Sequence, residues 1–138
     1  MLRIPRSILD AVIAHARRGL PNEACGYLAG KVCSAGGAAE IAAHFPLTNV
    51  DASPEHFGFD PAEQFAALRQ AGGLGLKLAA CYHSHPATPA RPSAEDIRLA
   101  YDPGISYVIV SLAAEAPEVK SFRIRNGEAT PEGIEVAP

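Results

Sequence analysis

The sequence predicts an α/β (α+β) fold with one mixed β-sheet covered by helices. The chain has 138 residues, of which 48% are apolar and 20% are charged, so it has the size and composition of one domain with one core. Segments with apolar residues at helical spacing alternate with short apolar runs bounded by glycine or proline. Helices on the faces of a mixed sheet would bury all of these elements. We therefore expect a single domain over residues 1–138.

Residues 5–18 are predicted to form the first helix, because apolar side chains recur there at helical spacing. These side chains are those of Ile4, Ile8, Val12 and Ile13. Gly19 and Pro21 follow, and both residue types commonly end a helix. His15 has no acidic or cysteine neighbour in this segment, so we interpret it as a structural or solvated histidine.

The apolar run from Glu23 to Gly30 predicts a buried strand that ends at glycine. Small residues at 34–38 predict a turn, and the segment Glu40–Phe45 is the expected hairpin partner. Glu23 stands at the mouth of the strand, where a carboxylate is either exposed at the edge of the sheet or directed into a site. The local sequence alone favours exposure.

The segment Pro46–Pro61 is predicted to be mostly loop, with a short extended piece at Phe57–Phe59. Loops of this length in a compact domain are usually functional or mobile. His44 and His56 lie at or in this loop without metal-ligand spacing to any neighbour, so we do not count them as ligands.

A second helix is expected to begin at Pro61 and to end at the Gly72-Gly73 pair. Asp60 is the predicted N-cap, and proline suits the first turn of a helix. Glu63 is in the position from which a side chain can reach back to the backbone N–H of the cap.

The second half of the chain predicts three strands. Residues 76–83 are apolar on both faces, which is typical of a central strand, and residues 105–112 form a second run of this kind. Residues 119–125 alternate polar and apolar side chains and are expected nearer an edge. Residues 130–138 either add a short strand or form an irregular tail.

The most informative stretch runs from Cys81 to Asp96. Side chains two residues apart on a strand point to the same face, so His83 and His85 can converge on one metal ion. Asp96 is the best candidate for a third ligand, because the loop between can fold the next helix back over the end of the strand. Two histidines and one carboxylate suit a hydrolytic zinc site, whose fourth position is left for water.

Further residues complete or compete with this interpretation. A buried carboxylate such as Glu23 can serve as the base for a bound water, and the Ser93 hydroxyl is in reach to stabilise an oxyanion. Taken alone, Ser93 after a proline is better interpreted as an N-cap, but one serine can fill both roles. Cys81 is a possible thiolate ligand, but we favour a buried floor beneath His83. Ser84 points to the opposite face and is expected to be structural.

Composition excludes several other functions. A formal charge of −3 without a basic stripe argues against nucleic-acid binding. No apolar run approaches the length that spans a bilayer, and the N-terminus has no signal-peptide pattern, so no membrane association is expected. Three cysteines without a C-x-x-C pair suit reduced thiols, which predicts a cytoplasmic protein.

Taken together, these residues resemble a known family. His83–Pro86, followed after six residues by Ser93–Asp96, looks like the JAMM signature of the MPN+ (Mov34/MPN/PAD-1) zinc metalloproteases. Glu23 with the following Cys25–Leu28 resembles the conserved-glutamate segment of that family. The likeness extends from the first helix to about residue 112, and the chain is most similar to the short, free-standing bacterial members.

The resemblance implies a curved mixed sheet flanked by helices, the cytidine-deaminase-like MPN/JAB fold. It also implies one Zn²⁺ per chain held by His83, His85 and Asp96, with Glu23 activating the zinc-bound water and Ser93 stabilising the oxyanion. Short bacterial members are associated with ubiquitin-like sulfur carriers of the ThiS/MoaD type and cut after the Gly-Gly end of the carrier.

The expected function is therefore a zinc metallopeptidase or isopeptidase whose partner is such a carrier. Two alternatives stay open. One is a zinc amidase that acts on another peptide or a small amide. The other is a binding or scaffold domain whose zinc is structural, for which Cys81 would have to supply a fourth ligand.

Overall fold

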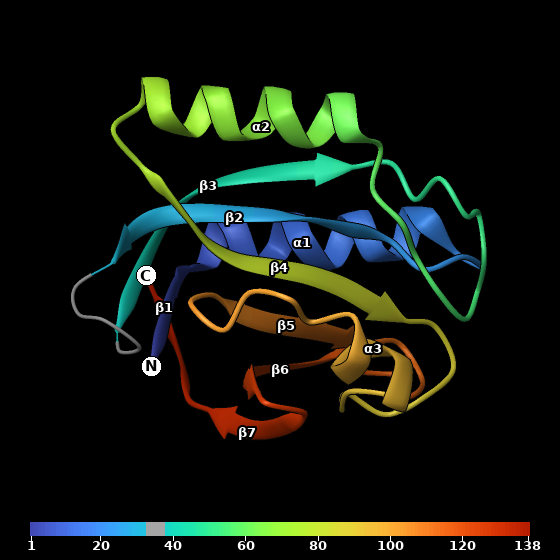
Figure 1. Cartoon of the computed structure of the whole chain (residues 1–138). Coiled ribbons are helices and arrows are strands. Elements are labelled where there is room, and N and C mark those ends of the chain that lie inside the picture. The colour runs from blue at the N-terminus through green and yellow to red at the C-terminus, as the bar shows by residue number, and fades with distance from the viewer. Residues whose placement is uncertain (33–37) are drawn as a thin grey trace.

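The computed structural model describes residues 1–32 and 38–138, and a mixed β-sheet forms its centre (Figure 1). Within the described residues the sheet has eight strands in the order β7-β6-β5-β4-β2-β3-β1-β8. The predicted α/β fold is confirmed. The strands are β1 (Leu2–Pro5), β2 (Cys25–Val32), β3 (Ala39–Leu47), β4 (Lys77–His85), β5 (Ser106–Ser111), β6 (Glu118–Arg125), β7 (Glu128–Glu132) and β8 (Ile134–Ala137). The helices are α1 (Arg6–Gly19), α2 (Pro61–Gly73) and α3 (Ala94–Arg98).

The sheet is curved because its two end strands are neighbours in the sequence. β7 pairs with β6 at one end of the sheet and β8 pairs with β1 at the other, yet only Gly133 separates β7 from β8. The N–H of Leu2 donates to the C=O of Gly133 at 2.9 Å, which ties this junction to β1. Register shifts in β2 between Leu28 and Gly30 mark bulges, which bend a strand further.

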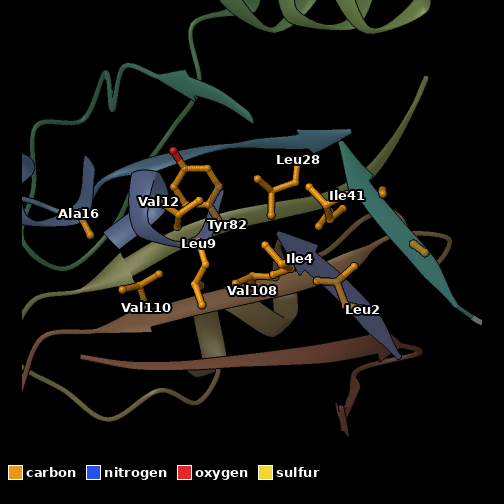
Figure 2. Close-up of a cluster of buried hydrophobic side chains, with 13 residues drawn as sticks. Leu2, Ile4, Leu9, Val12, Ala16, Leu28, Ile41, Tyr82, Val108 and Val110 are labelled. Atoms are coloured by element: carbon orange, nitrogen blue, oxygen red, sulfur yellow. The ribbon is translucent and has the colours of Figure 1, made fainter. Parts of the chain in front are cut away.

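Helices α1 and α2 cover opposite faces of the sheet. Side chains of α1 pack with Tyr82 of β4 and with Val108 and Val110 of β5 in a cluster that Figure 2 shows. Ala67 of α2 packs instead with Cys81, the neighbour of Tyr82, and therefore lies on the other face. Among the described helices, none has the length and apolarity that crossing a membrane requires.

Both ends of the chain differ from the sequence predictions. Ile4 lies in β1 rather than on the first helix, which begins at Arg6, because β1 pairs in parallel with both β3 and β8. The C-terminal residues form two strands, β7 and β8, where the sequence left a strand or a tail open. Residues 34–37 of the predicted turn lie outside the described residues.

The start of α2 agrees with the sequence in one respect and not in another. Asp60 is the N-cap as predicted, since its carboxylate accepts a hydrogen bond from the N–H of Ala62 at 3.0 Å. Glu63 does not reach back to the cap. Its carboxylate accepts from the N–H and the hydroxyl of Thr48 at 2.7 and 2.9 Å, and so it connects α2 to the loop after β3.

Tyr82 ties α1 and β3 to the centre of the sheet. Its hydroxyl lies 2.5 Å from Nδ1 of His15 and 2.6 Å from Nε2 of His44, and its side chain is fully buried. Burial lowers the pKa of both histidines, that of His44 to about 4, so both are neutral near pH 7. His15, which was predicted to be structural or solvated, and His44 are both structural in this cluster. Gly26 pairs with Tyr82 across the ladder, and a Cβ atom there would overlap the tyrosine ring.

We expect Gly26→Ala to destabilise the fold by about 1–3 kcal/mol, because the anchored Tyr82 ring cannot move away from an added methyl group. Gly72→Ala is the matched control, since an added Cβ has open space around it in α2 and should stabilise the helix by about 0.5–1 kcal/mol. Urea unfolding of both variants measures the difference. Equal stability of the two variants would contradict this account of Gly26.

Candidate metal centre

Two buried histidines end strand β4. His83 and His85 point to the face opposite α1 and are each only 4% exposed. β4 pairs with β2 on one side and with β5 on the other, so hydrogen bonds on both edges hold the backbone that carries the two side chains. The two rings are edge to face, with centroids 4.9 Å apart. The ring of Phe57 stacks on that of His83, with centroids 4.7 Å apart.

Asp96 comes to the histidines from the first turn of α3. Ser93 and Asp96 form a capping box, in which the hydroxyl of Ser93 accepts from the N–H of Asp96 at 3.0 Å and Oδ2 of Asp96 accepts from the N–H of Ser93 at 2.9 Å. The same Oδ2 lies 3.1 Å from Nε2 of His83 and 3.1 Å from Nε2 of His85. The two Nε2 atoms are also 3.1 Å apart. The three side chains that the sequence singled out as ligands are therefore brought together.

This triangle of donor atoms fits a zinc ion. Ligands at zinc distances of about 2.0–2.1 Å in tetrahedral geometry lie about 3.4 Å from one another, close to the spacing seen here. Burial disfavours the charged form of Asp96, but hydrogen bonding to His83 and His85 outweighs it and holds the pKa of Asp96 well below its usual range. The donor set is therefore two imidazoles and one carboxylate, which leaves one position of a tetrahedral ion open.

His85 presents the correct nitrogen to this triangle. Its Nδ1 lies 2.9 Å from the C=O of Pro89, and a carbonyl can only accept, so Nδ1 carries the proton. In the neutral imidazole, Nε2 then has a free lone pair that faces His83 and Asp96. Burial opposes the charged ring, but hydrogen bonds to Asp96 and Pro89 raise the pKa of His85, so a metal ion has to displace a proton there.

Glu23 is buried, and the expectation of an exposed carboxylate is wrong. The residue is only 5% exposed. Cys25 of β2 pairs with His83, and the N–H of Ser84 donates to the C=O of Ala24, so the antiparallel ladder sets Glu23 beside the end of β4. The local sequence could not reveal this, because the cover comes from β4 and from the loop after β3.

Backbone hydrogen bonds hold Glu23 in place. The N–H of Glu23 donates to the C=O of Ser53 at 2.8 Å, and the side-chain amide of Asn49 donates to the C=O of Glu23 at 3.0 Å. The N–H of Ala24 donates to the hydroxyl of Ser84 at 2.8 Å, so Ser84 has the structural role expected of it. Asn49 was not among the residues predicted for the site, although an asparagine near the start of a long loop is a recognisable signal for such bonds.

The carboxylate of Glu23 is not satisfied by its surroundings. Oε1 is buried and has no hydrogen-bond partner among the described residues. Burial raises the pKa of Glu23 to about 8, with contributions from Asp96, Glu95 and Glu55 in the same direction and an opposing one from His85. Buried polar atoms almost always have partners, so an atom without one beside a potential metal site indicates a place for water or substrate.

Ser93 and Cys81 are placed differently. The Ser93 hydroxyl oxygen caps α3, and because it accepts in that bond its own proton stays available to donate. Cys81 lies beneath His83 in an apolar cluster, and burial raises the pKa of its thiol far above the usual range. Among the described residues the candidate metal group contains His83, His85 and Asp96 without Cys81. Cys81 is the floor of the site.

A mostly apolar cavity of about 380 Å³ begins at His83 and Asp96. It extends over Cys81 and lies between the segment 57–59 and residues 99–107. At its far side the hydroxyl of Tyr27 accepts a hydrogen bond from the side-chain amide of Gln64 at 2.6 Å. The remaining apolar residues that line the cavity include Phe57, Phe59, Leu78, Ile105, Tyr107 and Ile109.

Three curated relatives are similar to this chain over much of their length. The CysO-cysteine peptidase of Mycobacterium tuberculosis is 38% identical over 137 residues, which are 99% of this chain and 91% of the relative. The probable TtuB-protein conjugate cleaving protease of Thermus thermophilus is 36% identical and covers 99% of this chain and 81% of its own. The desampylase of Haloferax volcanii is 36% identical over 74% of both chains.

Solved structures and a family profile agree with these relatives. A protein from Desulfitobacterium hafniense, solved in solution, superposes with a TM-score of 0.90 at 45% identity over 99% of this chain and 93% of its own. A JAB1/MPN domain protein from Archaeoglobus fulgidus has the same fold, with a TM-score of 0.65 at 23% identity over 99% of both chains. The profile described as prokaryotic homologs of the JAB domain matches residues 5–125. The chain therefore belongs to the prokaryotic JAB family, the JAMM/MPN+ relatives that its sequence resembles, and is a hydrolytic enzyme of that family.

Proposed function

We propose that this protein is a zinc-dependent peptidase or isopeptidase that cleaves the amide bond next to the C-terminal Gly-Gly of a ubiquitin-like sulfur-carrier protein of the ThiS/MoaD type. The observation that carries the proposal is the buried, unpartnered carboxylate oxygen of Glu23 beside the triangle of His83, His85 and Asp96. In this proposal residues 1–138 work as one domain in the cytoplasm.

Each residue of the site has a role in this mechanism. His83, His85 and Asp96 hold one zinc ion, which when bound polarises the scissile carbonyl and makes water a stronger acid. Glu23 takes a proton from the attacking water and passes it to the leaving amine, and a pKa raised towards neutrality suits that exchange. The hydroxyl of Ser93 donates to the oxyanion that develops on the carbonyl oxygen.

The backbone of the loop segment 57–59 supports binding of a slim, extended substrate. Asn49 and Phe59 form an isolated antiparallel β-bridge. The C=O of Gly58 accepts from the N–H of Val50 at 3.0 Å, and the N–H of Gly58 donates to Oδ1 of Asn49 at 3.1 Å. The backbone groups of Phe57 and Phe59 therefore point to the opposite edge, as they alternate along an extended chain. A carrier tail can pair there by strand addition, with glycines at the end that passes between His83 and Glu23.

The relatives support the same class of substrate. Their names describe a peptidase for CysO-cysteine, a protease for TtuB-protein conjugates and a desampylase. The first two names describe enzymes that cleave a conjugate, CysO-cysteine or TtuB-protein, which supports a carrier adduct as the class of substrate. The alternative of a structural zinc is less well supported, because such sites are normally closed by four protein ligands and the described residues bring three together here.

The first prediction concerns Glu23. Glu23→Gln should lower the rate of cleavage of a carrier–amino acid adduct by about 10²–10⁴-fold, because glutamine cannot accept the proton of the attacking water. Mass spectrometry of the zinc-loaded protein with such an adduct measures cleavage. Glu135→Gln, at an exposed position of β8, is the matched control and should cleave like the wild type. An inactive wild type, or an active Glu23→Gln variant, would contradict the proposal.

The second prediction concerns the metal. Asp96→Asn should keep the cap of α3 but lose zinc affinity, because a neutral amide is a poor ligand for zinc. Cys81→Ala should keep the metal, since Cys81 only forms the floor. Metal analysis after dialysis, with circular dichroism for the fold, distinguishes the two. Loss of metal in Cys81→Ala together with loss of the fold would favour a structural zinc site instead.

The third prediction concerns pH in metal-free protein. Glu23 has a pKa of about 8 when folded and an ordinary value of 4.5, so the unfolded chain loses this proton first as the pH rises. Its contribution to the free energy of unfolding should therefore fall between pH 4.5 and 8, by at most about 1.4 kcal/mol per pH unit. Urea unfolding of wild type and Glu23→Gln with a chelator present should show the variant gaining relative stability as the pH rises. Parallel pH dependences would show that Glu23 has an ordinary pKa.

A further inference from the structure

A network of partly buried hydrogen bonds connects strand β5 to His85. Ser111 pairs with His85 across the parallel ladder between β4 and β5 and is only 4% exposed. Its hydroxyl lies 2.6 Å from the C=O of Thr88 and 3.2 Å from the N–H of Ala113. A carbonyl can only accept and an amide N–H can only donate, so the proton of Ser111 is directed at Thr88.

Thr88 immediately precedes Pro89, whose carbonyl orients the ring of His85. The C=O of Pro89 lies 2.9 Å from Nδ1 of His85 and also accepts from the N–H of Arg91 at 2.9 Å. The position of this carbonyl depends on the loop 86–92, which belongs to no helix or strand. Among the described residues, Ser111 of β5 donates a side-chain hydrogen bond to that loop at Thr88, the residue before Pro89.

We infer that Ser111 is a positioning residue for the metal centre: by holding Thr88 it places the Pro89 carbonyl that keeps the proton of His85 on Nδ1. This inference rests on the proposed function, in which Nε2, the other ring nitrogen of His85, binds the metal. Partners that orient metal-ligating histidines commonly change metal affinity by about 10–100-fold when they are lost. Neither the motif nor the cavity reveals Ser111, which lies 26 residues beyond His85 in this numbering.

The experiment compares Ser111→Ala with Ser106→Ala, a matched control. Ser106 is also a buried serine of β5, but its hydroxyl donates to Glu132 at 2.6 Å, away from the centre. Competition for zinc against a chromophoric chelator should give a dissociation constant about 10-fold higher for Ser111→Ala and unchanged for Ser106→Ala. Ser111→Thr retains the hydroxyl and should restore tight binding. Circular dichroism of the metal-free variants monitors the fold.

A second readout needs no metal. Nitrogen-15 NMR of metal-free wild type should report a proton on Nδ1 of His85 in the neutral ring, whereas Ser111→Ala should show a mixture of the two tautomers. Wild-type zinc affinity and an unchanged tautomer in Ser111→Ala would overturn the inference, as would equal weakening by Ser106→Ala. A wild type that binds no zinc would overturn the proposed metal centre, and the tautomer of His85 would then decide the role of Ser111.

Discussion

One carboxylate oxygen, Oδ2 of Asp96, connects the two segments on which the site depends. It accepts the N–H of Ser93 in the capping box of α3 and contacts both imidazoles at the end of β4. A helix of five residues has little stability of its own, so the position of α3 depends on this contact and on the packing of Ile97 against the sheet. The capping bonds that start the helix also hold Asp96, the candidate ligand. Ser93 can therefore cap α3 and still lie at the site, where its hydroxyl can donate to an oxyanion.

The central position of β4 makes the buried polar site possible. Polar groups are costly to bury unless they are hydrogen-bonded, and His83, His85 and Asp96 satisfy one another in the metal-free chain. On the opposite face of the same strand, Tyr82 is fully buried in the larger apolar cluster. The strand therefore alternates between a face that stabilises the fold and a face that holds the chemistry. Glu23 differs from these three residues, because one of its carboxylate oxygens is buried without a hydrogen-bond partner among the described residues.

The long loop after β3 is part of the site rather than a simple connection. Asn49 ties the backbone of Glu23 to that of His56 and Gly58, and Ser53 accepts the N–H of Glu23. Phe57 from the same loop packs on His83. The loop thus covers Glu23, supports one ligand and lines the cavity in which we propose that the carrier tail binds.

The sequence alone predicted most of the fold and nearly all of the candidate site. The pattern of apolar residues located α1 and the central strands, and capping and stop signals located α2, because both kinds of signal depend on residues close together in the sequence. The histidine pair and the Ser93–Asp96 turn were recognisable because strand alternation and helix capping act within a few residues. Both of these signals are local.

Only the tertiary structure decided the features that depend on long-range pairing. β1 and β8 form a parallel pair although they lie at opposite ends of the chain, and such short strands have little sequence signal without their partners. Glu23 is buried because β4 and a distant loop enclose it, although its own neighbours in the sequence suggested exposure. The sequence by itself determined which residues are capable of binding a metal ion. The curvature and register of the sheet determined that these residues meet, because burial and contact arise between segments that are far apart in the sequence.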